Sequence, residues 1–208
     1  MKKILLFAMV VATLAGCNQS AVKEPQAPTA EKKNVVVENI MNRRSVRSYK
    51  PEQISDAQMD TIMKCAINAP SAMNLQPWEV RVVQDASLLN RINNRFYELS
   101  KSERKEGASV IHNAPTIIVV AKKKESGSSA SDCGMLAQNI LLSAESMGIG
   151  TCVVGSVYGV FNGEGSKEFM DAIKMPDTHE VMYAIAIGYK NESPQAKPRE
   201  ADKVQYIK

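Results

Sequence analysis

The chain has 208 residues, 44% of them hydrophobic and 23% charged, and its formal net charge is +4. This small positive excess does not indicate a protein that binds nucleic acid or strongly anionic surfaces. The four cysteines include no C-x-x-C pair and only two histidines are present, so the ligand spacing of a zinc site is missing. Among Cys65, Cys133 and Cys152 at most one disulfide is possible, and buried free thiols are expected instead.

The first 17 residues have the order of charge and hydropathy that is typical of an export signal. Two lysines precede an apolar run over 4–14, which is too short to cross a bilayer as a helix. The sequence L-A-G-C at 14–17 then resembles a bacterial lipobox, in which a signal peptidase cuts before the cysteine and the thiol carries a diacylglycerol. We therefore expect a lipoprotein signal peptide over 1–16 and lipidation of Cys17. An ordinary signal peptide and a buried helix with an incidental cysteine are the alternatives.

Export and lipidation predict a lipoprotein anchored to a membrane, on the periplasmic or cell-surface side. Residues 18–34 are polar and contain Pro25 and Pro28, so 17–34 are expected to be the lipidated cysteine and a flexible tether. Removal of 1–16 takes away two lysines and no acidic residue, and the charge falls to +2, from 24 cations and 22 anions. The remaining residues, 35–208, are numerous enough for one domain with its own core.

Hydrophobic periodicity and turn residues predict helices and strands that are mixed along the chain, without the strict alternation of βαβ units. Ser55, with Gln58 three residues later, is typical of a capping box, and Gly148 is typical of a helix end. We expect helices at 35–44, 55–69, 86–98, 131–147 and 166–175, strands at 78–85, 114–124, 150–157 and 180–189, a turn at 125–131, and a possible short strand at 204–207. This mixture predicts an α+β fold in which helices flank a sheet.

A basic segment, N-R-R-S-V-R-S-Y-K-P, follows the first expected helix. Arg43, Ser45 and Arg47 alternate where the chain becomes extended, so their side chains can converge on one anion. Arginine suits phosphate because its donors match the oxygens in pairs. Lys197 and Arg199 alternate in the same way near the other end of the chain and could close on the same phosphate. A solvated charged face is the alternative for both clusters.

The loop A-P-S-A-M-N-L-Q-P-W, at 69–78, joins a helix to a strand and offers small residues, amides and hydroxyls. It could hold a planar heterocycle with polar edges, or it could be a plain turn that places Trp78 in the core. Several common site motifs are missing, namely the phosphate-binding P-loop, the G-x-G-x-x-G fingerprint and the G-x-S-x-G nucleophile turn. His112 and His179 are expected to have surface or structural roles.

These segments together resemble the signature of the nitroreductase-like flavoproteins. Five pieces occur in the family's order: R-x-S-x-R at 43–47, P-S-x-x-N-x-Q-P-W at 70–78, a helix ending in G-x-G-[ST] at 137–151, the pair Gly155 and Ser156, and the basic pair Lys197 and Arg199. The resemblance covers nearly everything from 35 to 208. The long insertion that larger members carry after the 155–156 turn is missing here.

The resemblance implies a central, mainly antiparallel sheet flanked by helices, and a homodimer with FMN at its interface. It assigns the FMN phosphate to Arg43, Ser45, Arg47, Lys197 and Arg199. It assigns the isoalloxazine ring or the ribityl chain to Pro70, Ser71, Met73 and Asn74, from the partner subunit, and places Gly155 and Ser156 against the ring near N5. Asp132 occupies a position that touches flavin in some members, whereas Arg44 and Lys50 are expected to be solvated.

The resemblance also implies an oxidoreductase in which NAD(P)H reduces the flavin and N5 passes hydride or electrons to a nitroaromatic, a quinone or a similar small aromatic acceptor. No catalytic side chain, metal ion or nucleic acid is expected to take part. The lipobox conflicts with the donor, because nicotinamide cofactors are not expected in useful supply outside the cytoplasm. The alternatives are a membrane-anchored flavin-binding electron carrier that uses another reductant, and a scaffold that has lost its cofactor. The phosphate residues at both ends of the chain argue against the last.

Overall fold

The computed structural model describes residues 33–208, of which Asn34–Lys208 form one compact unit. The expected signal peptide, Cys17 and most of the expected tether lie outside the described residues. Within the described part of the chain, no helix has the length and apolar character needed to span a membrane. The fold below is therefore that of the domain expected at 35–208.

Four strands form one antiparallel sheet in the order β1-β2-β4-β3. Their bounds are β1 Trp78–Val83, β2 Thr116–Lys123, β3 Ile149–Val154 and β4 His179–Tyr189. The register pairs Val80 with Val120, Val119 with Ala184, and Cys152 with Ala186. The mainly antiparallel sheet expected from the sequence is confirmed, and β1 and β3 form its two edges.

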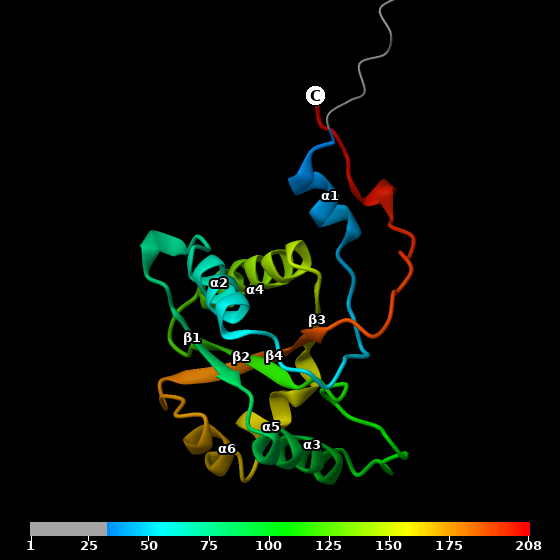
Figure 1. Cartoon of the computed structure of the whole chain (residues 1–208). Coiled ribbons are helices and arrows are strands. Elements are labelled where there is room, and N and C mark those ends of the chain that lie inside the picture. The colour runs from blue at the N-terminus through cyan, green and yellow to red at the C-terminus, as the bar shows by residue number, and fades with distance from the viewer. Residues whose placement is uncertain (1–32) are drawn as a thin grey trace, which may run out of the picture. The chain divides into compact units, whose positions relative to one another are not determined.

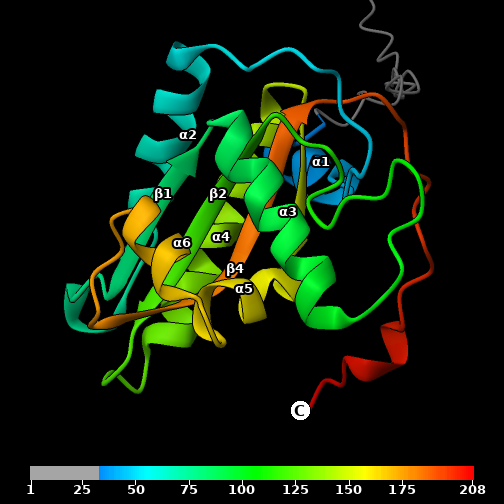
Figure 2. The same cartoon turned by 90° about the horizontal axis from the view of Figure 1, so that it is seen from below.

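Helices cover both faces of the sheet (Figures 1 and 2). Their bounds are α1 Val35–Asn42, α2 Asp56–Ile67, α3 Ala86–Ser100, α4 Ser129–Ser146, α5 Tyr158–Asn162 and α6 Lys167–Ala172. Helices α2 and α4 lie over one face, and α3, α5 and α6 over the other. Strand β2 is a continuous apolar run because both of its faces are covered: Ile118 packs in the core between the sheet and α2 and α4, and Ile117 in the core between the sheet and α3 and α5.

The expected elements are confirmed in position, with four differences. The strand expected at 150–157 ends at Val154, and Gly155–Val157 form a 3-10 turn. Helix α4 begins at Ser129, inside the segment 125–131 that was expected to be a turn. Helix α5 was not expected, and it turns the chain back under the sheet after β3. The possible strand at 204–207 is wrong: its large apolar side chains are 65–92% exposed. The β3 edge that it could have joined is already paired with the basic segment at Ser45.

Local signals at the helix ends are also confirmed. The Ser55 hydroxyl accepts from the Gln58 main-chain N–H at 3.3 Å, and the Gln58 side chain accepts from the Ser55 N–H at 3.2 Å. Gly148 follows α4 with φ +73°, a conformation that favours glycine. The three cysteines of the described chain are free, with Cys133 and Cys152 buried and Cys65 half-buried.

Candidate functional site

The basic segment lies along the β3 edge of the sheet. Ser45 pairs with Thr151, and the Val46 N–H donates to the Thr151 carbonyl at 2.9 Å. Val46 is 1% exposed and anchors the segment in the core, so the residues on either side of it point outward. The alternation seen in the sequence therefore places Ser45 and Arg47 on the same outer side.

A pocket of about 160 Å³ opens on this edge. Its lining residues are Arg43, Arg44, Ser45, Arg47, Pro194, Gln195, Lys197 and Arg199. The structure thus brings together the two basic clusters that lie at opposite ends of the sequence. Arg44 also lines the pocket, although the sequence analysis expected it to be solvated.

None of the five cations of this pocket forms an ion pair with another residue of 33–208. The hydrogen bonds that their side chains make go to main-chain carbonyls, such as Arg44 Nη1 to Met41 at 2.7 Å and Arg199 Nη1 to Lys197 at 3.0 Å. Five cations gathered without a direct ion pair repel one another, so a bound anion would stabilise them. Guanidinium groups are well suited to a phosphate here.

Three buried or half-buried side chains lie behind the basic segment, and its charge acts on their pKa values. Burial raises the pKa of the Cys152 thiol, while Arg47 and Arg43 act to lower it. The pKa of His112 is lowered, first by burial and then by Arg47. Burial also raises the pKa of Tyr49, whose hydroxyl donates to the Val46 carbonyl at 2.5 Å. His112 was expected to have a surface or structural role, and the loop before β2 brings it to this site with φ +57°.

Gly155 and Ser156 follow β3 directly and are exposed on the same edge. They form a 3-10 turn with Val157, which is fully buried and fixes the turn to the core. Ser45 pairs with Thr151, four residues before Gly155, so the turn lies about 13 Å further along the β3 edge.

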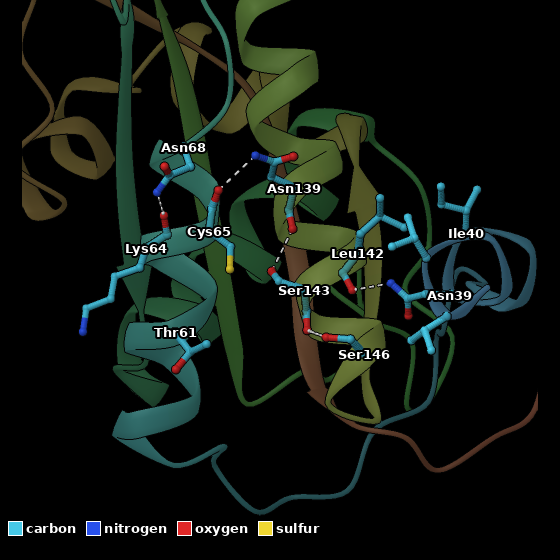
Figure 3. Close-up of a pocket in the computed structure, with 12 residues that line it drawn as sticks. Asn39, Ile40, Thr61, Lys64, Cys65, Asn68, Asn139, Leu142, Ser143 and Ser146 are labelled. Atoms are coloured by element: carbon cyan, nitrogen blue, oxygen red, sulfur yellow. Dashed lines mark hydrogen bonds between the residues drawn. The ribbon is translucent and has the colours of Figure 1, made fainter. Parts of the chain in front are cut away.

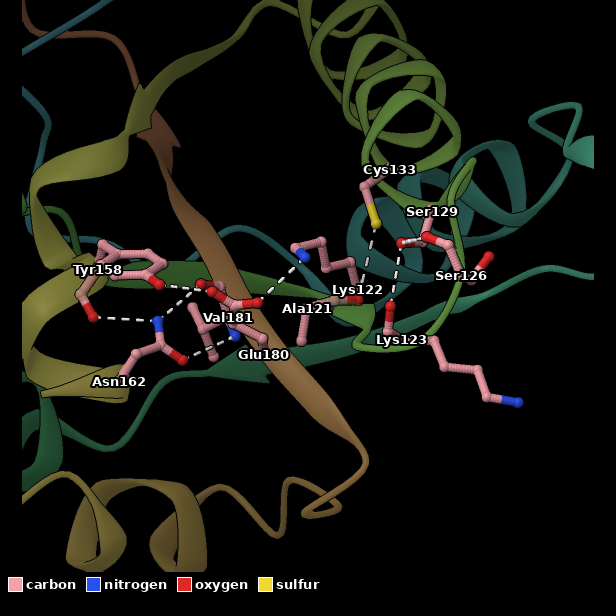
Figure 4. Close-up of polar contacts among 10 residues, drawn as sticks. All are labelled: Ala121, Lys122, Lys123, Ser126, Ser129, Cys133, Tyr158, Asn162, Glu180 and Val181. Carbon is pink, nitrogen blue, oxygen red and sulfur yellow. Dashed lines mark hydrogen bonds and ion pairs between the residues drawn. The ribbon is translucent and has the colours of Figure 1, made fainter.

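A set of polar contacts holds the turn in place from the α5 side (Figure 4). The Tyr158 hydroxyl donates to Glu180 Oε1 at 2.5 Å, and Lys122 Nζ lies 3.0 Å from Glu180 Oε2. The Tyr158 hydroxyl and the Lys122 ammonium lower the pKa of the Glu180 carboxyl. Asn162 Nδ2 donates to the Val181 carbonyl at 2.8 Å. Helix α5 is thereby fastened to β4, which restrains the preceding turn.

The loop at 70–76 lies at the opposite edge, where it leads into β1. Met73, Asn74 and Gln76 have φ of 50°, 56° and 48°, a left-handed conformation that disfavours residues with a Cβ. The Ser71 hydroxyl accepts from the Gln76 N–H at 3.0 Å and helps to hold this shape. Pro70, Met73 and Asn74 are exposed, and Met73 is 87% exposed. Backbone strain of this kind is commonly found at ligand sites.

Asp132 supports that loop from below. It is 1% exposed in the first turn of α4, and its carboxylate accepts from the Ala72 N–H at 3.4 Å. The structure therefore gives Asp132 a role in positioning the loop, and its direct contact with flavin stays a prediction.

The two sets of predicted site residues lie on opposite edges of the sheet. The basic pocket and the 155–156 turn belong to the β3 edge, and the 70–76 loop leads into β1. Three strand spacings, or about 14 Å, separate the edge strands. A single chain does not bring the two sets together, which agrees with the expectation that the loop acts on a partner subunit.

A groove between α1, α2 and α4 forms a further exposed surface, with a volume of about 600 Å³ (Figure 3). The polar side chains drawn there largely bond to nearby main-chain carbonyls, such as Asn139 Nδ2 to Cys65 at 2.9 Å and Asn39 Nδ2 to Leu142 at 2.9 Å. Several apolar side chains of α1 remain exposed, including Val36 at 67% and Ile40 at 48%. This surface has the character of an unpaired protein interface.

The comparisons with known proteins decide the family. The model of the nitroreductase family matches residues 40–189. The chain belongs to the nitroreductase family. It is 32% identical to a relative from Archaeoglobus fulgidus over 74% of this chain and 84% of that protein. It is 28% identical to the NADPH-flavin oxidoreductase of Vibrio harveyi over 80% of this chain and 70% of that protein.

Solved structures of nitroreductases have the same fold. A Desulfitobacterium hafniense nitroreductase with bound FMN aligns with a TM-score of 0.78 at 29% identity, covering 85% of this chain and all of that one. A Bacteroides fragilis nitroreductase with bound FMN aligns equally well at 25% identity. A model of the prokaryotic membrane lipoprotein lipid attachment site matches residues 1–18. The family, its fold and the lipoprotein attachment site expected from the sequence are confirmed.

Proposed function

We propose that this protein is a lipid-anchored, FMN-dependent oxidoreductase. The observation that carries the proposal is the pocket of five unpaired cations on the β3 edge, in a chain of the nitroreductase family. FMN reductases and FMN-bound nitroreductases stand among its relatives and structural neighbours. When bound, FMN would supply electron transfer from a donor to an acceptor that shares its ring face.

The residues of the β3 edge fit the charged end of FMN. Arg43, Arg47 and Arg199 can present paired N–H donors to phosphate oxygens, and Lys197 adds a point charge. The exposed Gly155 and Ser156 are small and leave room for a flat ring beside the end of β3. The chain's own part in the reaction is thus to bind and orient the cofactor and to keep one ring face open.

The residues of the β1 edge fit the neutral part of the same cofactor. In the proposed site, a second copy of the chain supplies these residues. Ser71 and Asn74 offer a hydroxyl and an amide, and Pro70 and Met73 offer apolar surface. The exposed apolar side chains of α1, the groove beside it and the apolar tail at 204–207 give a dimer its contact surface. A homodimer would then contain two sites, each built from both chains.

NAD(P)H is the proposed electron donor, since several relatives are named for that activity. A nitroaromatic, a quinone or a similar small aromatic compound is the proposed acceptor. Within the described residues no group of three or more His, Cys, Asp and Glu side chains could hold a metal ion.

The lipid attachment site favours a second candidate function. An anchored protein on the outer side of a cytoplasmic membrane would meet little NAD(P)H, and a membrane-anchored flavin-binding electron carrier that uses another reductant would suit that place.

One experiment separates these functions. The full chain is purified in detergent and loaded with FMN, and its flavin absorbance is followed after addition of NADH or NADPH, and separately after dithionite. The proposed enzyme bleaches with a nicotinamide and then turns over with a nitroaromatic or a quinone. Bleaching by dithionite alone would favour the carrier, and a protein that retains no FMN would contradict both.

A further inference from the structure

The two halves of the basic pocket meet at a short seam. Residues 189–192 run antiparallel to 47–50, with the Lys50 N–H donating to the Tyr189 carbonyl at 2.9 Å. The Asn191 N–H donates to the Ser48 carbonyl at 3.0 Å. This ladder sets the exit direction of the tail that later carries Lys197 and Arg199.

Glu192 adds the last contact of the seam. Its carboxylate Oε1 accepts a hydrogen bond from the main-chain N–H of Arg47, the residue that also lines the pocket. Directly afterwards Ser193 and Pro194 turn the chain toward the pocket, and Pro194 already lines it. The Glu192 side chain therefore joins the first half of the pocket to the start of the second.

The exposed Glu192 carboxylate carries a negative charge beside the basic pocket. Glu192 lies close enough to act on the pKa of Tyr49, His112 and Cys152, each of which also senses Arg47. A negative charge so near the pocket weakens the attraction of the five cations for any anion. The carboxylate would repel an anion in the pocket, and its hydrogen bond to the Arg47 N–H offsets that repulsion. This points to a role of Glu192 in the geometry of the pocket rather than in its charge.

We propose that Glu192 is a positioning residue for the phosphate pocket: its carboxylate oxygen, bonded to the Arg47 N–H, sets Lys197 and Arg199 opposite Arg43 and Arg47. The inference rests on the proposed function, since it concerns how well that pocket holds FMN. What the seam needs is an acceptor oxygen, and a glutamine amide supplies one without the charge.

The test compares Glu192→Ala and Glu192→Gln with the wild-type full chain in detergent. Glu200→Ala serves as a matched control, because Glu200 is an exposed acid of the same tail whose ion pair is with Lys203. Dissociation constants are measured for FMN and for riboflavin, which has the same ring and ribityl chain but no phosphate, together with the melting temperature. The ratio of the two constants reports on the phosphate pocket alone.

We expect Glu192→Ala to weaken FMN binding about tenfold and to leave riboflavin binding unchanged. Glu192→Gln should bind FMN at least as tightly as the wild type, and Glu200→Ala should match the wild type. Tighter FMN binding in both Glu192 variants would overturn the inference, because the carboxylate would then act only as a repelling charge. Equal losses for FMN and riboflavin would also overturn it, since they would indicate a general role in folding. A wild-type protein that binds no FMN would instead contradict the proposed function.

Discussion

The two edges of the sheet carry opposite kinds of surface. The β3 edge gathers five unpaired cations around a small pocket, and the loop before β1 has no charged residue between 70 and 76. One edge suits the charged end of a ligand, and the other suits a neutral, flat, polar-rimmed group. Each edge is fully folded within one chain but provides only part of the proposed binding site.

The edges are also held in different ways. The basic segment is fixed by one main-chain hydrogen bond from Val46 to β3, by main-chain bonds to Tyr189 and Asn191 at and after the end of β4, and by Val46 in the core. The 70–76 loop is held in left-handed backbone by the Ser71 side chain and by Asp132. The cations are thus held at the edge of the sheet, whereas in the proposed site recognition of the ring depends on a strained loop from a second chain.

Loss of the cations at the β3 edge should have the largest effect on FMN binding. We expect the Arg43→Ala, Arg199→Ala double variant to weaken FMN binding about 100-fold or more, since each residue can make hydrogen bonds to a charged group worth about 1.5–3 kcal/mol. Flavin fluorescence titration measures the effect. The exposed pair Lys105→Ala, Lys123→Ala removes the same net charge elsewhere and should bind FMN normally. Equal weakening in both double variants would mean that overall charge, and not the pocket, attracts FMN.

Charges placed on α1 should weaken the proposed dimer, which brings the β3 edge of one chain to the β1 edge of the other. Val36→Asp with Ile40→Asp puts two carboxylates where the structure exposes apolar side chains. Each apolar side chain buried in a dimer stabilises it by about 1.5–3 kcal/mol, so the dimer should dissociate about 100-fold more easily. Sedimentation velocity measures this, with FMN retention as a second readout. Leu99→Asp, at a position 37% exposed on α3, is the control and should remain dimeric.

A methyl group at Gly150 should shift the β3 edge without any change of charge. A Cβ there would lie 2.9 Å from Val46 Cγ1 and 2.9 Å from Lys190 Cγ, so the basic segment and the start of the tail would have to move. We expect Gly150→Ala to cost about 1–3 kcal/mol of stability and to weaken FMN binding. Denaturant unfolding gives the first quantity. Gly127→Ala meets nothing within 4 Å and should change neither; an unchanged Gly150→Ala protein would refute the close packing of this edge.

Acid should weaken the fold slightly through His112, beside the same edge. Its pKa is lowered in the folded state by burial and by Arg47, so the neutral ring is favoured on folding. The resulting stability is present above the unfolded pKa of about 6.5 and is lost as the pH falls through the lower, folded value. Urea unfolding between about pH 7.5 and about pH 5.5 should therefore show a flatter decline for His112→Gln than for the wild type. His179→Gln, whose own pKa is also lowered, gives the comparison at a site away from the pocket. If the stability of His112→Gln falls with pH as steeply as that of the wild type, His112 does not have a lowered pKa beside this edge.

Much of the fold followed from local patterns. The apolar run of β2 and the capping box at Ser55 each depend on residues that are near in sequence, and both were confirmed. The alternation of Arg43, Ser45 and Arg47 indicated a common side, and the structure places all three on one pocket.

Other features depend on contacts between distant segments and could not be predicted. Nothing near Glu192 in the sequence indicates that its side chain bonds to Arg47, and the loop that brings His112 to the same place has no periodicity. Arg44 was assigned to solvent because a charge run usually is solvated, and only the fold shows that it lines the pocket. Helix α5 is too short for a periodic signal.

In the proposed dimer, one cofactor site uses the β3 edge of one chain and the β1 edge of its partner. Mixed dimers test it most directly, made by co-expressing the Arg43→Ala, Arg199→Ala variant with a Ser71→Ala, Asn74→Ala variant under two affinity tags. Each variant alone should retain little FMN. The mixed dimer should regain one tightly bound FMN per dimer, because one of its two sites then joins an intact basic pocket to an intact loop. A mixed dimer that binds no more FMN than its two parents would show that both halves of each site come from the same chain, and would contradict the claim.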